Sequence, residues 1–119
     1  MLRGAAGSSW LRGLYATGSF NLGAPEDYRV PDGGVHRERP GPLYLPTAAL
    51  VAEVLSRRDE TFARLGFYAA HGVDEVWVLD AEARSVRVWQ LREEEYAETS
   101  VSDVLGTTGA EVAAEVDRL

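Results

Sequence analysis

The sequence predicts a mixed α/β domain, and two patterns carry this prediction. Residues 48–80 contain a buried strand, an amphipathic helix and a second apolar strand, an order that makes the two strands parallel neighbours in one sheet. Short segments on both sides of this unit are typical of meander strands. With 119 residues, of which 45% are hydrophobic, the chain suits one domain with a single core.

The central unit has the clearest local signals. Residues 48–55 form an apolar run interrupted only by Glu53, which predicts a strand that is buried on both faces. A helix is expected over 60–71. Asp59 is a suitable N-cap for this helix, and Gly72 is suited to the position just after its end.

The outer segments are shorter. Residues 19–22, 28–30, 76–79 and 85–91 are expected to be strands, whereas 36–46 contains three prolines and is expected to be an irregular connection. Three further segments are expected: a solvated hairpin tip at 93–95, a terminal helix over 109–119, and a poorly ordered, Gly-rich stretch over 1–9.

Composition narrows the classes of function. The chain has no cysteine and two histidines, which excludes thiolate metal sites and argues against a histidine-rich zinc site. No apolar run approaches the length of a membrane span and no signal peptide is recognisable, so a cytoplasmic protein without a membrane partner is expected. The net charge of −7 comes from residues 61–119, because 1–60 is balanced. An acidic protein gains little from long-range attraction to DNA.

Glu53 is the first candidate for chemistry. An ionised carboxylate in the middle of a buried strand is costly unless it is paired or bound to a cation. Val51 and Leu55 share its face of the strand, so an outward Glu53 would lie between two outward apolar residues. The alternative, an edge strand with Glu53 in water, stays open from periodicity alone.

Asp32 is the second candidate. It lies in the stretch Pro31-Asp32-Gly33-Gly34, which is itself a turn signal, so a turn residue is the simpler interpretation. Together with Glu53, however, it would supply the one or two carboxylates that Mg²⁺ sites in proteins use.

The expected helix adds a polar stripe. Arg64, Tyr68 and His71 follow one another at spacings of four and three and therefore share one face. A solvated stripe is the simpler interpretation. If the helix folds back over the end of the Glu53 strand, Arg64 could instead reach the carboxylates. The opposite face, expected to be buried, holds Phe62, Leu65 and Ala69.

The chain resembles the Uma-two family of putative restriction endonucleases, part of the PD-(D/E)xK nuclease superfamily, in three stretches: FNLGAPEDYRVPDGGV, YLPTAALVAEVLS and DETFARLGFYAAHGVDEVWVLD. The resemblance runs from about Phe20 to the C-terminus. The combination is specific: a Pro-Asp strand end, a strand ending Glu-Val-x-Ser, a helix with Phe-Tyr-Ala, then Gly-Val and an apolar strand ending in Asp.

This resemblance implies a restriction-endonuclease-like fold over residues 20–119, with a mixed β-sheet flanked by helices. Residues 1–19 would be a poorly ordered or truncated segment, because family members look longer at this end. The resemblance also implies a Mg²⁺ site, which could also take Mn²⁺, formed by Asp32, Glu53 and the backbone carbonyl of Val54.

The superfamily's lysine has no counterpart. Its usual place, two residues after the Glu, is Leu55 here. In the Uma-two pattern the lysine looks to have moved onto the following helix, and that position is Arg64. The chain contains no lysine at all. Arginine can stabilise negative charge that develops on a phosphate, but it cannot serve as a proton acceptor.

Two functions follow from the resemblance. The first is a Mg²⁺-dependent endonuclease that hydrolyses DNA phosphodiester bonds, with Asp32, Glu53 and Arg64 as catalytic residues. The alternative is a catalytically degenerate nuclease-fold domain that acts as a binding or interaction module. The arginine at position 64, the short N-terminus and the acidic surface favour the alternative. A homodimer is compatible with both.

Overall fold

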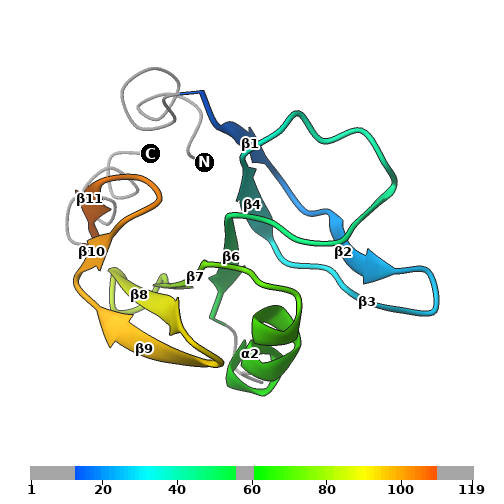
Figure 1. Cartoon of the computed structure of the whole chain (residues 1–119). Coiled ribbons are helices and arrows are strands. Elements are labelled where there is room, and N and C mark those ends of the chain that lie inside the picture. The colour runs from blue at the N-terminus through cyan, green and yellow to red at the C-terminus, as the bar shows by residue number, and fades with distance from the viewer. Residues whose placement is uncertain (1–12, 56–60, 110–119) are drawn as a thin grey trace.

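The computed structural model describes residues 13–55 and 61–109 (Figure 1). A six-stranded main sheet has the order β1-β4-β6-β7-β8-β9. Its strands are β1 (Tyr15–Thr17), β4 (Gly33–His36), β6 (Leu50–Val54), β7 (Glu75–Asp80), β8 (Ser85–Arg92) and β9 (Glu95–Thr99). Strands β6 and β7 are parallel, whereas the other neighbouring pairs are antiparallel. The mixed sheet predicted from the sequence is therefore confirmed.

Three smaller units surround the main sheet. A hairpin of β2 and β3 pairs with β5 in a second sheet, and β10 pairs with β11. Helix α2 connects β6 to β7 and lies against one face of the main sheet (Figure 1). The bounds are β2 (Asn21–Ala24), β3 (Asp27–Arg29), β5 (Tyr44–Leu45), β10 (Val101–Ser102), β11 (Thr107–Thr108) and α2 (Thr61–Ala70).

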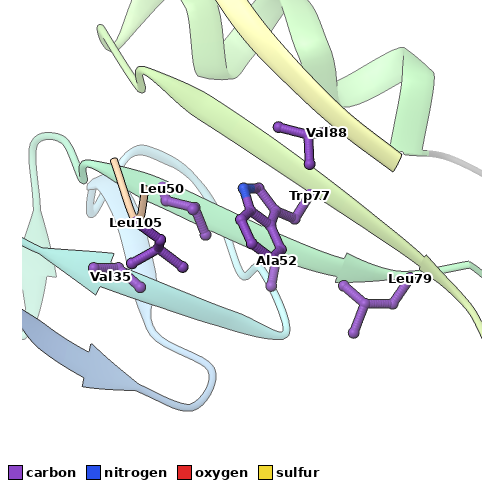
Figure 2. Close-up of a cluster of buried hydrophobic side chains, with 7 residues drawn as sticks. All are labelled: Val35, Leu50, Ala52, Trp77, Leu79, Val88 and Leu105. Atoms are coloured by element: carbon purple, nitrogen blue, oxygen red, sulfur yellow. The ribbon is translucent and has the colours of Figure 1, made fainter. Parts of the chain in front are cut away.

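Side chains alternate between two cores along the central strands. One face of the sheet carries the cluster in Figure 2, where Trp77 lies between Leu50 and Leu79. The other members of this first cluster are Val35, Ala52, Val88 and Leu105. Because successive residues of a strand point to opposite faces, Val51 and Val76 belong to the second cluster, on the α2 side. Strand β6 is thus buried on both faces, as its apolar run predicted.

The second cluster joins α2 and β2 to the main sheet. Its fully buried members are Leu22, Val51, Tyr68, Val73 and Val76. The helix ends as the sequence predicted, because Gly72 has a φ of +69° and its amide donates to the carbonyl of Ala69.

Strand β4 corrects the interpretation of Gly33 and Gly34 as turn residues. All four residues of β4 are buried, and β4 pairs with β1 on one side and β6 on the other. A Cβ on Gly34 would lie 2.4 Å from a ring carbon of Phe20, so glycine is required here by close packing. The glycine pair therefore belongs to a strand interior.

Further differences concern the outer segments. Strand β1 lies inside the stretch 1–19 that the sequence separated from the domain, so the sheet begins before residue 20. Residues 93 and 94 form the exposed turn between β8 and β9, as predicted. The expected terminal helix, apart from its first residue, the N-cap at Asp59 and the stretch 1–9 lie outside the described residues.

A buried carboxylate ties the end of the described chain to the sheet. Glu75, on β7, has no exposed surface and accepts five hydrogen bonds. The donors are the side chains of Trp77, Gln90 and Ser102 and the backbone amides of Asp103 and Val104. This charge is fully satisfied by the protein itself and therefore holds β10 and the turn after it against β7.

Candidate metal centre

Sheet register brings the two candidate carboxylates together. Gly33 on β4 pairs with Ala52 on β6 in the antiparallel ladder. Continuing this register by one residue places Asp32 directly opposite Glu53. Residues directly opposite in an antiparallel pair have Cβ atoms about 4.5–5.5 Å apart. The register of β4 and β6 therefore brings Asp32, in the bend just before β4, and Glu53 to the same end of the strand pair.

Asp32 is exposed and uses one carboxylate oxygen to hold the strand end. Its Oδ2 accepts a hydrogen bond from the backbone amide of Val54 at 2.8 Å. Within the described part of the chain, Oδ1 accepts no hydrogen bond. This oxygen is therefore available to a ligand.

Glu53 is buried, with 4% of its surface exposed, and is only half satisfied. Its Oε2 accepts a hydrogen bond from Nη1 of Arg64 at 3.2 Å, an ion pair. Its Oε1 is buried without a hydrogen-bond partner among the described residues. Burial raises the pKa of Glu53; the charge of Arg64 opposes this rise, and the charge of Asp32 adds to it.

Arg64 lies one turn into α2 and faces Glu53. Besides the ion pair, its Nη1 donates to the carbonyl of Val30 at 3.4 Å, in the connection between β3 and β4. Its side chain is 29% exposed, so the guanidinium is reachable from solvent while it spans two elements. The helix therefore folds back over the end of β6, as the second interpretation of the stripe required.

Tyr68 lies one turn further along α2 and is fully buried, which corrects its interpretation as part of a solvated stripe. Its hydroxyl makes no hydrogen bond within the described structure. Burial and then the charge of Glu53 raise the pKa of Tyr68 to about 12. His71, the third stripe residue, stacks on Phe67, and its Nδ1 lies 2.9 Å from the carbonyl oxygen of Phe67.

The face of α2 expected to be buried is only partly so. Leu65 packs against the second cluster, Ala69 is partly exposed, and the side chain of Phe62 lies outside what the structure describes. At the usual lysine position, Leu55 packs against the same cluster. The predicted third ligand, the Val54 carbonyl, belongs to the last residue of β6, and its role as a ligand stays a prediction.

The centre has the donor set of a hard cation. Asp32 and Glu53 each use one oxygen within the protein and keep the other free, and oxygen ligands of this kind suit Mg²⁺ or Mn²⁺. Among residues 13–55 and 61–109, no group of three or more His, Cys, Asp or Glu side chains is arranged to hold a metal. Two carboxylates are enough for Mg²⁺, which keeps several waters.

Comparisons with known proteins identify the family and the fold of the chain. A family model described as "Putative restriction endonuclease" (Uma2) matches residues 5–115. The crystal structure of a putative nuclease belonging to DUF820, from Anabaena variabilis ATCC 29413, is similar with a TM-score of 0.61 and 16% identity, over 95% of this chain and 74% of that chain. No curated protein matches the chain. The structural likeness confirms the predicted restriction-endonuclease-like fold. No helix in the described residues is both long and apolar enough to cross a membrane.

Proposed function

The chain belongs to the Uma2 family of putative restriction endonucleases, and from this premise we propose that it is a Mg²⁺-dependent endonuclease that hydrolyses DNA phosphodiester bonds. One observation supports the metal site above all others: the buried Oε1 of Glu53 has no partner in the described structure. A buried carboxylate oxygen without a donor is costly, and a bound cation would remove that cost.

The residues fit such an ion. Asp32 Oδ1 and Glu53 Oε1 are the free oxygens of two carboxylates on paired strand ends, and the carbonyl of Val54 would be the third protein ligand. A bound Mg²⁺ would supply an activated water and would stabilise the negative charge of the phosphate. The hydrogen bonds from Val54 and Arg64 hold one oxygen of each carboxylate, Asp32 Oδ2 and Glu53 Oε2, and leave the other oxygen of each for the ion.

Arg64 would act on charge rather than on protons. An arginine side chain stays protonated at neutral pH, so its role is to donate hydrogen bonds to the phosphate as negative charge develops. The ion pair with Glu53 fixes the guanidinium at the edge of the centre. No lysine is present in the chain to accept a proton in its place.

A plasmid-nicking assay with Mg²⁺ and with Mn²⁺ tests this proposal. Wild type should nick DNA, and Asp32→Ala and Glu53→Ala should not, because each removes a metal ligand. Glu98→Gln is the matched control, since Glu98 is a surface carboxylate on β9 that pairs with Arg87. Arg64→Lys should preserve or raise the rate. Nicking by both alanine variants at the wild-type rate would refute the site.

A second function is favoured by one specific observation. The chain has no lysine, and Arg64, which takes the corresponding helix position, is paired with Glu53. A catalytically degenerate domain that binds a partner or DNA without cutting would keep the fold and this ion pair. Such a domain would show no nicking with either metal, even at protein concentrations where it binds DNA in a gel-shift assay.

A further inference from the structure

Two tyrosines pack in the second cluster and differ in one respect. Tyr96 is partly buried, and its hydroxyl donates to the carbonyl of Val73 at 2.6 Å. Tyr68 is fully buried, and its hydroxyl makes no hydrogen bond in the described structure. The first hydroxyl is therefore explained by the fold, and the second is not.

Packing alone would favour phenylalanine at position 68. The ring fills a cluster of aliphatic side chains around Val51, Val73 and Val76. Phenylalanine would fill the same space without burying a hydroxyl that lacks a partner. Because unpaired buried polar groups are rare in folded proteins, this hydroxyl calls for an explanation outside packing.

The position of Tyr68 supplies that explanation. It follows Arg64 by one helical turn on α2, so both side chains lie on the face that meets Glu53. This spacing brings the Tyr68 hydroxyl near the Arg64–Glu53 ion pair, and the charge of Glu53 raises the pKa of Tyr68 while the charge of Arg64 lowers it. Glu53 Oε1, an acceptor, also lacks a partner. A donor and an acceptor, both buried and both unsatisfied, thus lie at the same centre.

We propose that Tyr68 is a positioning residue for Glu53: its hydroxyl donates a hydrogen bond to the Glu53 carboxylate when a divalent cation is bound, and so fixes the orientation in which Oε1 meets the cation. The inference rests on the proposed function, because it needs a cation at the Asp32–Glu53 centre. Partners of this kind, which hold a ligand rather than the metal, typically contribute 10–100-fold in metal affinity.

The test compares wild type, Tyr68→Phe and Tyr96→Phe in two measurements. Mn²⁺ affinity is measured by isothermal titration calorimetry, and the melting temperature is measured without metal. Tyr68→Phe should weaken Mn²⁺ binding by about tenfold or more, with a metal-free melting temperature equal to or above that of wild type. Tyr96→Phe should keep the affinity and melt at a lower temperature, because it loses its bond to Val73.

The outcomes separate the inference from the function on which it rests. Equal Mn²⁺ affinity in wild type and Tyr68→Phe would overturn the role of Tyr68 and leave the metal site intact. A lower metal-free melting temperature in Tyr68→Phe would also overturn it, since the hydroxyl would then be holding the fold. Absence of Mn²⁺ binding by wild type would overturn the metal site and the inference together.

Discussion

Replacing Glu75 by glutamine should destabilise the protein far more than the loss of a surface charge would. The carboxylate is fully buried and accepts five hydrogen bonds, from side chains and from two backbone amides. Glutamine has the same shape, but one of its two terminal atoms is a donor. Either that atom faces Trp77 and Ser102, or it faces Gln90 and the two amides, so donor meets donor in both orientations.

The less costly orientation sets the magnitude. With the glutamine nitrogen toward Trp77 and Ser102, the serine hydroxyl can rotate and accept, so one buried donor, the Trp77 indole N–H, loses its partner. Leaving one buried donor unsatisfied costs about 1–3 kcal/mol. The remaining bonds also lose a charged acceptor, and bonds to charged groups are worth about 1 kcal/mol more than neutral ones. The free energy of unfolding should therefore fall by roughly 2–4 kcal/mol.

Urea unfolding of the purified variant measures this change, with Glu98→Gln as the control. Glu98 is an exposed carboxylate paired with Arg87, so its neutralisation should leave the unfolding midpoint close to that of wild type. Hydrogen exchange adds a local readout, because the amides of Asp103 and Val104 should exchange faster in Glu75→Gln. If Glu75→Gln unfolds at the wild-type midpoint with unchanged exchange at these amides, the buried carboxylate does not anchor β10.

Three further predictions concern charge and packing. Burial raises the pKa of Glu53, so the folded metal-free protein binds a proton more tightly than the unfolded chain does and loses stability as the pH rises above about 4.5. In urea titrations at several pH values, Glu53→Gln should show less of this loss. Mg²⁺ should stabilise wild type but not the variant. Burial lowers the pKa of His36, so stability should decline as pH falls below 6.5, and His36→Gln should lack this component in melts between pH 8 and about 5. Gly34→Ala should lower the free energy of unfolding by about 1–3 kcal/mol, because its Cβ would lie 2.4 Å from the Phe20 ring. Gly66→Ala, on open helix surface, should raise the free energy of unfolding by about 1 kcal/mol. Equal unfolding midpoints for the two variants would contradict the packing argument.

The central unit could be predicted because its signals are local. The apolar run ending at Val54, the helix and Gly72 each depend on neighbouring residues, and the structure confirms all three. Hydrophobic periodicity gives the length and type of such elements directly. The parallel pairing of β6 and β7 followed from their order with the helix between them.

Strand β4 could not be predicted from local signals. Gly33 and Gly34 favour a turn by propensity, and their place in a buried strand depends on Phe20 and Thr17, which approach from elsewhere in the chain. A tertiary contact thus overrides local preference. The position of Asp32 opposite Glu53 depends on this strand and its register. The family resemblance therefore named the site residues, but it could not predict how they are arranged in space.

Tyr68 and Glu75 show a second limit. Periodicity places Tyr68 on the same face of α2 as Arg64, which the structure confirms, but it does not show that the Tyr68 side chain is fully buried. The burial of Glu75 depends on donors up to 29 residues away, two of them backbone amides that any sequence would supply. A pattern of residue types carries no record of such partners.

The order of the site residues along the chain has a consequence for mutagenesis. The groups of the proposed centre, Val30, Asp32, Glu53, Arg64 and Tyr68, all come from the first 68 residues. Strands β8 and β9 lie at the far edge of the main sheet, and β10 and β11 form a separate pair. Substitutions in the later strands reach the centre only through the stability of the sheet. If the proposed centre binds a metal, substitutions in β8 to β11 should therefore change metal affinity less than substitutions at Asp32, Glu53 or Arg64 do.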